Sequence, residues 1–233
     1  MAKTVSKTWV LMILDESGSM GGLEKDVIGG SNRYVKELQK EDGSYILKFV
    51  KFDTTFGVHD LFDWTELKDV RALKGVDYKP SGGTPLYDAV GVSLSNVKLP
   101  KGDKGLCVVF TDGEENSSHE YTAEKVKTLI ERLEDKGWAF AYLGAGLAGW
   151  TQDAVNMGFA GQSMATSAFS DAGSTSGSFM ALRQVTSNYA AGTATADSLY
   201  SGISQDLIDG KSVPAMDVPV KAAPKKKRVV KVK

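Results

Sequence analysis

Short apolar runs that end in polar or glycine-containing segments recur along this 233-residue chain. The run from Trp9 to Leu14 is followed at once by the polar stretch from Asp15 to Ser19. A short, continuous apolar run bounded in this way is typical of a buried β-strand. We therefore predict strands at residues 9–14, 44–52, 56–62, 105–111 and 138–144, and a last edge strand near Phe159.

Segments between the predicted strands carry apolar residues at helical spacing. The first such segment follows Gly21-Gly22 and ends at Asp42-Gly43, where glycine terminates the helix. Its apolar face is formed by Leu23, Val27, Ile28, Val35 and Leu38. The same spacing predicts helices at residues 85–97, 122–135, 150–157 and 179–189. A short helix or irregular cover is expected at residues 64–73. Residues 161–178 are rich in Ser, Gly and Ala and are expected to form a loop.

Strands that alternate with helices form a mostly parallel sheet that is covered by helices on both faces. The predicted fold class is therefore α/β, with a doubly wound, Rossmann-like central sheet and one antiparallel edge strand at residues 56–62. We predict one domain over residues 1–193. Residues 194–211 are expected to form a weakly structured or helical extension, and residues 212–233 a flexible basic tail.

Oxygen-bearing side chains alternate along the loop that follows the first predicted strand. Asp15, Ser17 and Ser19 provide one carboxylate and two hydroxyl groups, with Gly18 between the serines. Hard divalent cations prefer oxygen ligands, and Mg²⁺ keeps part of its water. The loop therefore has the composition of a cation site, and it leaves the carboxyl end of a strand, where open α/β sheets place their sites.

The spacing of Asp15, Ser17 and Ser19 after a buried strand resembles the metal-ion-dependent adhesion site of von Willebrand factor type A (VWA) domains. Members of that family carry a threonine on a second loop, which Thr84 matches here. They also carry an aspartate at the end of a later strand, which Asp112 matches. The resemblance extends over roughly residues 7–192 and implies a VWA domain.

The resemblance also implies how these five residues would be used. Ser17, Ser19 and Thr84 would supply oxygen atoms to the metal, some of them through water. Asp15 and Asp112 would supply negative charge, often through bridging waters. The implied cofactor is Mg²⁺, with Mn²⁺ or Ca²⁺ as alternatives, and one metal position would be left for a Glu or Asp from a protein partner. The implied function is metal-bridged protein–protein recognition.

Each residue of this set has a structural alternative. Asp15, Ser17 or Ser19 could cap the following helix, Thr84 could be the N-cap of the next helix, and Asp112 with Gly113 is a common turn sequence. The charged and polar neighbours are expected to be rim charge or loop polarity rather than ligands: Glu16, Asp88, Glu114, Glu115, Asn116 and His119.

Charge is distributed unevenly along the chain. The formal net charge is −1, yet the segment from Lys221 to Lys233 contains seven Lys or Arg and no acid, against 21 basic and 29 acidic residues elsewhere. The segment 224–229 resembles a basic nuclear-import signal, and such a composition also serves nucleic-acid contact or solubility. We expect the tail to bind nucleic acid or another acidic surface. The residues concerned are Lys225, Lys226, Lys227, Arg228, Lys231 and Lys233.

Composition argues against several other classes of protein. Cys107 is the only cysteine, which excludes an intrachain disulfide. Because it lies within an apolar strand, we predict that it is a core residue. A chain without disulfides suits a reducing compartment. The apolar run near the N-terminus is too short for a membrane span or a secretory signal. The chain has two histidines, His59 and His119, and neither a nucleophile elbow nor a phosphate-binding glycine loop, so an enzyme is not expected.

Three functional hypotheses follow. The first is a cytoplasmic, metal-dependent interaction module that binds an acidic side chain of a protein partner. The second is a structural or docking component of a phage virion or another large assembly, because residues 111–116 and 142–145 are most similar to stand-alone bacterial and phage members of the VWA family. There the tail would contact nucleic acid or a neighbouring subunit, in the host cytoplasm or the virion. The third is nucleic-acid binding by the tail alone, which deletion of residues 221–233 would abolish.

Overall fold

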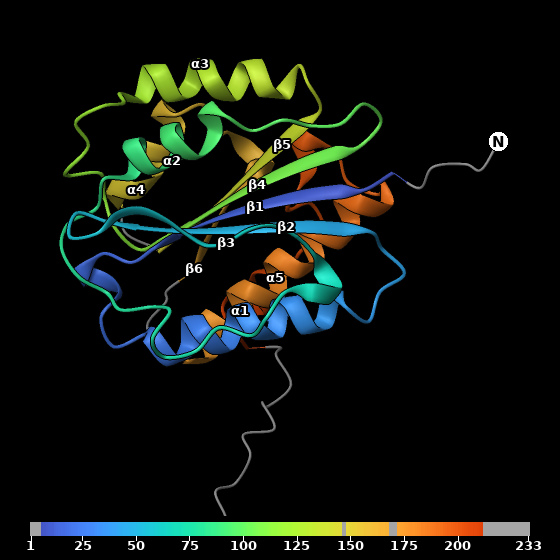
Figure 1. Cartoon of the computed structure of the whole chain (residues 1–233), viewed down its shortest axis with the longest axis horizontal. Coiled ribbons are helices and arrows are strands. Elements are labelled where there is room, and N and C mark those ends of the chain that lie inside the picture. The colour runs from blue at the N-terminus through green and yellow to red at the C-terminus, as the bar shows by residue number, and fades with distance from the viewer. Residues whose placement is uncertain (1–5, 146–147, 168–171, 212–233) are drawn as a thin grey trace, which may run out of the picture.

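The computed structural model describes residues 6–145, 148–167 and 172–211 (Figure 1). These residues form a six-stranded sheet in the order β3-β2-β1-β4-β5-β6. β3 is antiparallel to β2 at one edge, and the other neighbouring strands are parallel. The strands are β1 (Thr8–Asp15), β2 (Tyr45–Asp53), β3 (Gly57–Glu66), β4 (Lys104–Thr111), β5 (Trp138–Ala145) and β6 (Met164–Ser167).

Helices cover both faces of the sheet (Figure 1). One face carries α2 (Leu86–Ser95), α3 (Ala123–Glu134) and α4 (Ala148–Asn156). The other face carries α1 (Glu24–Leu38) and α5 (Ala172–Ala191). The remaining described helical segments are short: α6 (Gln205–Ile208) and 3₁₀ turns at Gly18–Met20, Leu67–Asp69, Gly161–Ser163 and Ala196–Ser198.

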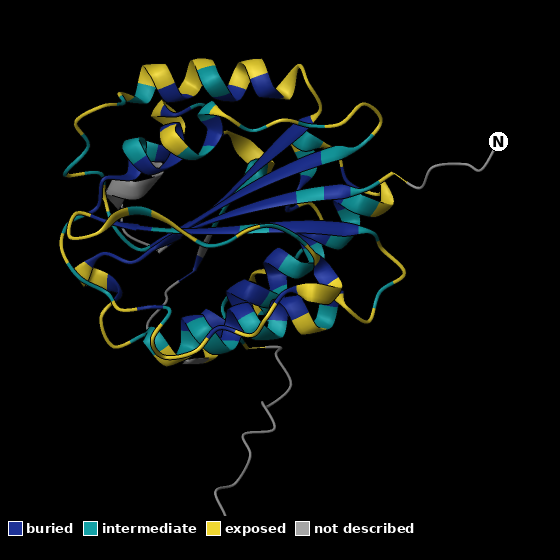
Figure 2. Ribbon diagram, in the orientation of Figure 1, coloured by how far each residue is buried: buried dark blue, intermediate teal, exposed yellow. Residues whose placement is uncertain are grey.

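Alternate residues of β1 enter two separate cores. Val10, Met12 and Leu14 pack in the core beneath α1 and α5, whereas Leu11 and Ile13 pack in the core beneath α2, α3 and α4. All five side chains are fully buried, and Figure 2 shows the central strands mostly in dark blue between helices with exposed outer faces. A strand that is buried on both faces must be apolar at successive positions. The predicted doubly wound α/β sheet with one antiparallel edge strand is thereby confirmed.

The antiparallel edge strand is longer than predicted. We expected it to end at Phe62 and to be followed by a helix or irregular cover over residues 64–73, but β3 continues to Glu66. Trp64 packs edge-on against Trp9 of β1, with ring centroids 5.2 Å apart. This contact reaches from β3 across β2 to β1, and local periodicity does not report contacts between strands.

The opposite edge strand also differs from the prediction. It was expected near Phe159, but β6 lies at Met164–Ser167, inside the segment that was expected to be a loop. The Phe159 ring is buried instead, edge-on to Tyr142 at 5.2 Å. An aromatic residue after an apolar segment therefore marked the core rather than a strand.

Helix α5 begins at Ala172, earlier than the predicted residue 179. The added turns come from the Ser- and Gly-rich stretch, whose weak helix propensity favoured a loop. A glycine of α1 allows α5 to pack closely against it: a Cβ added at Gly30 would lie 2.2 Å from the ring of Phe179. Tertiary packing thus outweighs local propensity here.

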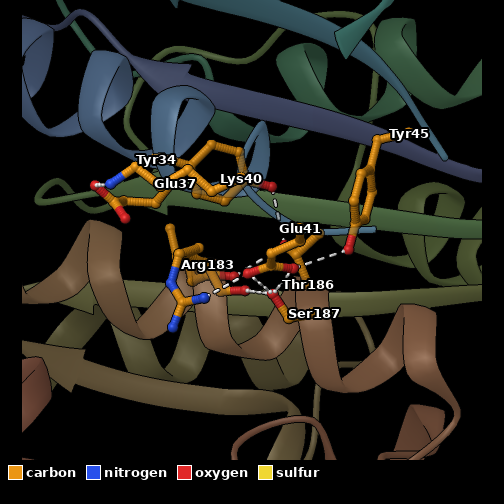
Figure 3. Close-up of polar contacts among 9 residues, drawn as sticks. Tyr34, Glu37, Lys40, Glu41, Tyr45, Arg183, Thr186 and Ser187 are labelled. Atoms are coloured by element: carbon orange, nitrogen blue, oxygen red, sulfur yellow. Dashed lines mark hydrogen bonds and ion pairs between the residues drawn. The ribbon is translucent and has the colours of Figure 1, made fainter. Parts of the chain in front are cut away.

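A polar cluster fastens α5 to the segment between α1 and β2 (Figure 3). Arg183 forms an ion pair with Glu41, and the hydroxyl of Ser187 donates to the same carboxylate, with Oγ 2.8 and 2.6 Å from its two oxygens. The Tyr45 hydroxyl donates to it at 3.2 Å. This cluster lies at the amino edge of the parallel strands, so it supports the fold away from the loops described below.

Residues 194–211, predicted to be an extension, pack against the core that α1 and α5 cover. Leu199, Tyr200 and Ile208 are buried there. The division at residue 193 therefore stays a prediction. The predicted tail, 212–233, and all six of its candidate binding residues lie outside the described residues. In the described ranges, no helix combines the length and apolarity that crossing a membrane requires.

Candidate metal centre

The five oxygen-bearing side chains singled out in the sequence are placed at the carboxyl edge of the parallel strands. Asp15 is the last residue of β1, and Ser17 and Ser19 follow it directly. Thr84 lies just before α2, and Asp112 directly follows β4. Because β1 and β4 are adjacent parallel strands, their carboxyl ends lie side by side.

Hydrogen bonds join the loop after β1 to the loop after β4. Ser19 Oγ donates to Asp112 Oδ1 at 2.7 Å, and the hydroxyls of Ser17 and Ser19 are 3.0 Å apart. Asp15 Oδ1 accepts the backbone N–H of Ser17 at 2.7 Å. Four of the five side chains therefore belong to one connected group.

Gly113 shows where the fifth, Thr84, joins this group. A Cβ added at Gly113 would lie 2.8 Å from Thr84 Oγ1 and 3.5 Å from Asp15 Oδ2. Both oxygens therefore border the same small space. Any side chain at residue 113 would intrude on it, so glycine keeps a cradle open between the three loops.

The two carboxylates place negative charge where water stabilises it poorly. Burial raises the pKa of Asp15 from 3.8 to about 6, although hydrogen bonds from Thr111 and Ser17 act in the opposite direction, and the nearby Asp112 raises it further. Burial also raises the pKa of Asp112. Among the described residues, neither carboxylate forms an ion pair with Lys or Arg. A cation in the cradle would supply the missing positive charge.

The donor atoms fit a hard divalent cation, because all of them are carboxylate or hydroxyl oxygens. The described part of the chain contains no group of three or more His, Cys, Asp or Glu side chains placed to hold a metal. Asp15, Ser17 and Thr84 are buried, whereas Ser19 is exposed and Asp112 half-buried. The centre is therefore closed towards the core and open to solvent on the side of Ser19 and Asp112.

Glu16 connects the first loop to the second, so its predicted place on the rim is wrong. Its carboxylate is 1% exposed, forms an ion pair with Lys51 at 2.8 Å and accepts the backbone N–H of Lys79. Its backbone carbonyl accepts the N–H of Ser81 at 2.8 Å. In addition, the Tyr78 hydroxyl donates to the backbone carbonyl of Asp15. These bonds hold the loop before α2 against the loop after β1.

Other polar residues expected on the rim also support the loops. Asp88 accepts backbone N–H bonds from residues 119–121 at 2.7 to 2.9 Å, and Glu115 accepts them from residues 87, 117 and 118. Asn116 Oδ1 accepts the N–H of Thr84 at 2.9 Å and so positions that threonine. Glu114, in contrast, is exposed, as rim charge would be.

Two residues of the centre were missed in the sequence. Thr111 Oγ1 donates to Asp15 Oδ2, and Gly113 forms the cradle. Thr111 is a polar residue at the end of an apolar strand, which is a usable signal once that strand is known to lie beside β1. Gly113 is indistinguishable in sequence from an ordinary turn glycine.

The helix-capping alternatives are wrong. Ser17 precedes the 3₁₀ turn at Gly18–Met20 but makes no capping hydrogen bond with its side chain, and the residue before α1 is Leu23. Pro85, not Thr84, occupies the N-cap position of α2. These hydroxyls are thus not used to satisfy helix ends.

Comparison with known proteins gives matches among solved structures only, since no family model and no curated protein matches the chain. The SpaC pilus adhesin of Lactobacillus rhamnosus GG aligns with a TM-score of 0.64 and 11% identity over 81% of this chain and 31% of its own. A von Willebrand factor type A protein from Catenulispora acidiphila aligns with a TM-score of 0.57 and 12% identity over 78% and 43%. Proximal thread matrix protein 1 of the mussel byssus, with a zinc-occupied MIDAS motif, aligns with a TM-score of 0.55 and 14% identity over 71% and 42%.

The chain spans less than half the length of each of these proteins. At these identities the likeness concerns the fold. A mostly parallel sheet with an antiparallel edge strand, flanked by helices, is common to this chain and to VWA structures. The chain therefore has the VWA-like, Rossmann-type α/β fold.

Proposed function

We propose that this chain is a protein-interaction module that binds a divalent cation between Asp15, Thr84 and Asp112 and, through that cation, an acidic side chain of a partner. One observation carries the proposal: oxygen side chains from three loops surround a cradle that Gly113 keeps open, and no cation of the described chain balances its two carboxylates. The neighbours in fold, a pilus adhesin and a protein with a metal-occupied MIDAS motif, support it.

The buried and the exposed residues of the centre would have different roles. Asp15, Ser17 and Thr84 are buried and would hold the cation from the protein side. Ser19 and Asp112 border solvent, which is where a partner would approach. The cation would provide the positive charge and a position for an external carboxylate. Mg²⁺ fits such hard oxygen ligands, with Mn²⁺ or Ca²⁺ as alternatives.

Binding is a better account of the site than catalysis. The His59 ring bonds to the backbone carbonyl of Phe56, and the backbone N–H of His119 bonds to Asp88. Neither of these hydrogen bonds leads into the centre. The proposed module therefore recognises a partner without transforming it.

A titration of Mg²⁺ into the full chain, followed by calorimetry, tests the first half of the proposal. The chain should bind about one ion, and Asp112→Ala should lose most of that affinity because it removes one of two charged groups. Glu131→Ala, a change of the same type on the exposed face of α3, is the matched control and should bind as the unaltered chain does. Equal binding by Asp112→Ala would place the cation elsewhere.

The second half of the proposal, binding of a partner's carboxylate through the cation, is tested with Mn²⁺ in place of Mg²⁺. Acetate or a glutamate-containing peptide should displace water from protein-bound Mn²⁺ and lower the water proton relaxation rate. The amide analogue, acetamide or a glutamine-containing peptide, should not. If both lower it equally, carboxylate capture is wrong even where cation binding is right.

The role as a virion or assembly component stays a prediction. Its distinguishing feature, the basic tail with residues such as Lys225 and Arg228, lies outside the described residues.

A further inference from the structure

A groove lies next to the metal centre and is not part of it. Its walls are the β2–β3 hairpin with Thr54 and Val58, the start of α2 with Asp88 and Val92, and the loop 117–120. Its volume is about 430 Å³. Thr54 Oγ1 accepts the N–H of Gly83, the residue before Thr84, at 2.7 Å. The groove and the cradle are therefore separated only by the loop that carries Thr84.

The groove combines acidic and apolar side chains. Asp53, Asp88 and Glu120 line it together with Val58, Pro85 and Val92. None of these three carboxylates forms an ion pair within the described ranges. Asp53 is fully buried and accepts the N–H of Phe56, and Asp88 accepts the backbone N–H bonds of residues 119–121, so Glu120 is the exposed acid of the groove. Lys125 Nζ bonds to the backbone carbonyl of Glu120 at 2.9 Å.

Apolar side chains are unusually exposed at this place. Of the four large hydrophobic residues recorded as exposed in the described chain, Val92 lines the groove at 41% exposure, and Phe56 stands at 58% beside its Gly57 wall. A surface with an exposed acid, Glu120, and a second carboxylate without a cationic partner, Asp88, beside exposed apolar groups suits a segment that alternates basic and apolar residues. Long basic side chains cover apolar surface while keeping their charge near acids.

The chain itself contains such a segment. From Arg228 onward the sequence reads Arg-Val-Val-Lys-Val-Lys, and Lys225–Lys227 precede it. Gly210, close to where the described chain ends, contacts the first turn of α5, since a Cβ added there would meet the carbonyl of Gly173. α5 follows β6, so this point lies at the same edge of the sheet as the metal centre.

The segment between the described chain and the basic residues is long enough to reach the groove. The 13 residues between Lys211 and Lys225 can extend about 45 Å. A domain of about 200 residues is about 40 Å across. The groove therefore lies within range of the basic segment of its own chain.

We propose that the basic tail of this chain docks intramolecularly in the groove between the β2–β3 hairpin, α2 and the loop 117–120. The docked tail covers surface beside the metal edge, and a partner that extends over this surface must displace it. The proposal does not depend on cation binding, so its test is made with a chelator present and its failure leaves the proposed function untouched.

The test uses the full chain with a spin label at Val230→Cys. Cys107 is the only cysteine of the unaltered chain and is fully buried, so the spin label should react with the added cysteine. Amide signals of residues 57–58 and 117–120 should lose most of their intensity when the label is paramagnetic. The loss should disappear when Lys225, Lys226, Lys227 and Arg228 are all changed to Gln, and should weaken at high salt.

A charge reversal at the groove provides the matched pair of variants. Glu120→Lys should restore most of the lost intensity, whereas Glu131→Lys on the exposed face of α3 should leave the loss unchanged. An unlabelled spectrum of each variant verifies the fold. Equal loss in both variants would overturn the proposal.

Two further outcomes would also overturn it. In the first, spin-labelled chains are mixed with isotope-labelled chains that carry no spin label. Loss of amide intensity in this mixture would show that the tail contacts a second copy of the chain. A tail that leaves the groove amides unaffected but binds duplex DNA would have nucleic acid as its ligand.

Discussion

At the residue scale, Gly113 shows how the absence of a side chain shapes the candidate centre. We expect Gly113→Ala to lower Mg²⁺ affinity by about 10-fold or more, an effect of the size seen when the surroundings of metal ligands are altered. The added methyl would lie 2.8 Å from Thr84 Oγ1 and push it out of the cradle. Calorimetric titration measures the loss.

The matched control is Gly29→Ala in α1, where an added Cβ meets nothing within 4 Å. Since alanine is the better helix former, this variant should be more stable by about 0.5–1 kcal/mol and bind Mg²⁺ normally. Equal affinities for the two variants would show that the space beside Gly113 is not the cation site.

The Asp15 carboxyl should make the stability of the metal-free chain depend on pH. Its pKa is raised from 3.8 to about 6 by burial, so the folded chain holds the proton more tightly than the unfolded chain. The stabilisation from this group is complete below its unfolded pKa and is lost as the pH rises through about 6, by about 3 kcal/mol in total. Asp112, whose pKa is also raised, acts in the same direction.

Mg²⁺ should therefore stabilise the chain more at pH about 7.5 than at pH about 5, where it competes with protons. Urea unfolding with Mg²⁺ or with a chelator at the two pH values measures the difference, and Asp15→Asn should remove it. An equal effect of Mg²⁺ at both pH values would contradict the assignment of Asp15 to the site.

At the element scale, α4 holds the loop that carries Asp112. Asp153 accepts the N–H of Glu115 at 2.9 Å and the hydroxyl of Tyr87 at 2.6 Å, and so joins α4, α2 and this loop. Asp153→Ala should lower Mg²⁺ affinity several-fold, because the loop loses its support while the ligands remain. Gln152→Ala, on the exposed side of the same helix, should have no effect. A normal titration of Asp153→Ala would show that the loop is held without α4.

At the scale of the whole molecule, residues 194–211 contribute to the main core. Leu199, Tyr200 and Ile208 are buried beside α1 and α5. A chain that ends at residue 193 should be less stable than one that ends at residue 211 by about 5 kcal/mol, from the burial of three large side chains. Urea unfolding of the two chains decides this, and equal midpoints would support the predicted boundary at 193.

The sequence predicted helices and strands correctly where the burial of an element is visible in its own pattern of apolar residues. β1, β4 and β5 are apolar along their length because both faces are covered, and α3 carries its apolar residues at helical spacing. The errors, at β3, β6 and the start of α5, fall where contacts with distant residues decide the structure. Trp64 against Trp9 and Phe179 against Gly30 are such contacts.

For the candidate centre, the sequence by itself determined which oxygen atoms are available: a motif of Asp15, Ser17 and Ser19, with Thr84 and Asp112 named by resemblance. The tertiary structure decided that they lie together, because β1 and β4 are neighbours and Glu16 binds the second loop. It also decided that Glu16, Asp88 and Glu115 are structural, because hydrogen-bond partners come from loops that only the folded sheet brings within reach.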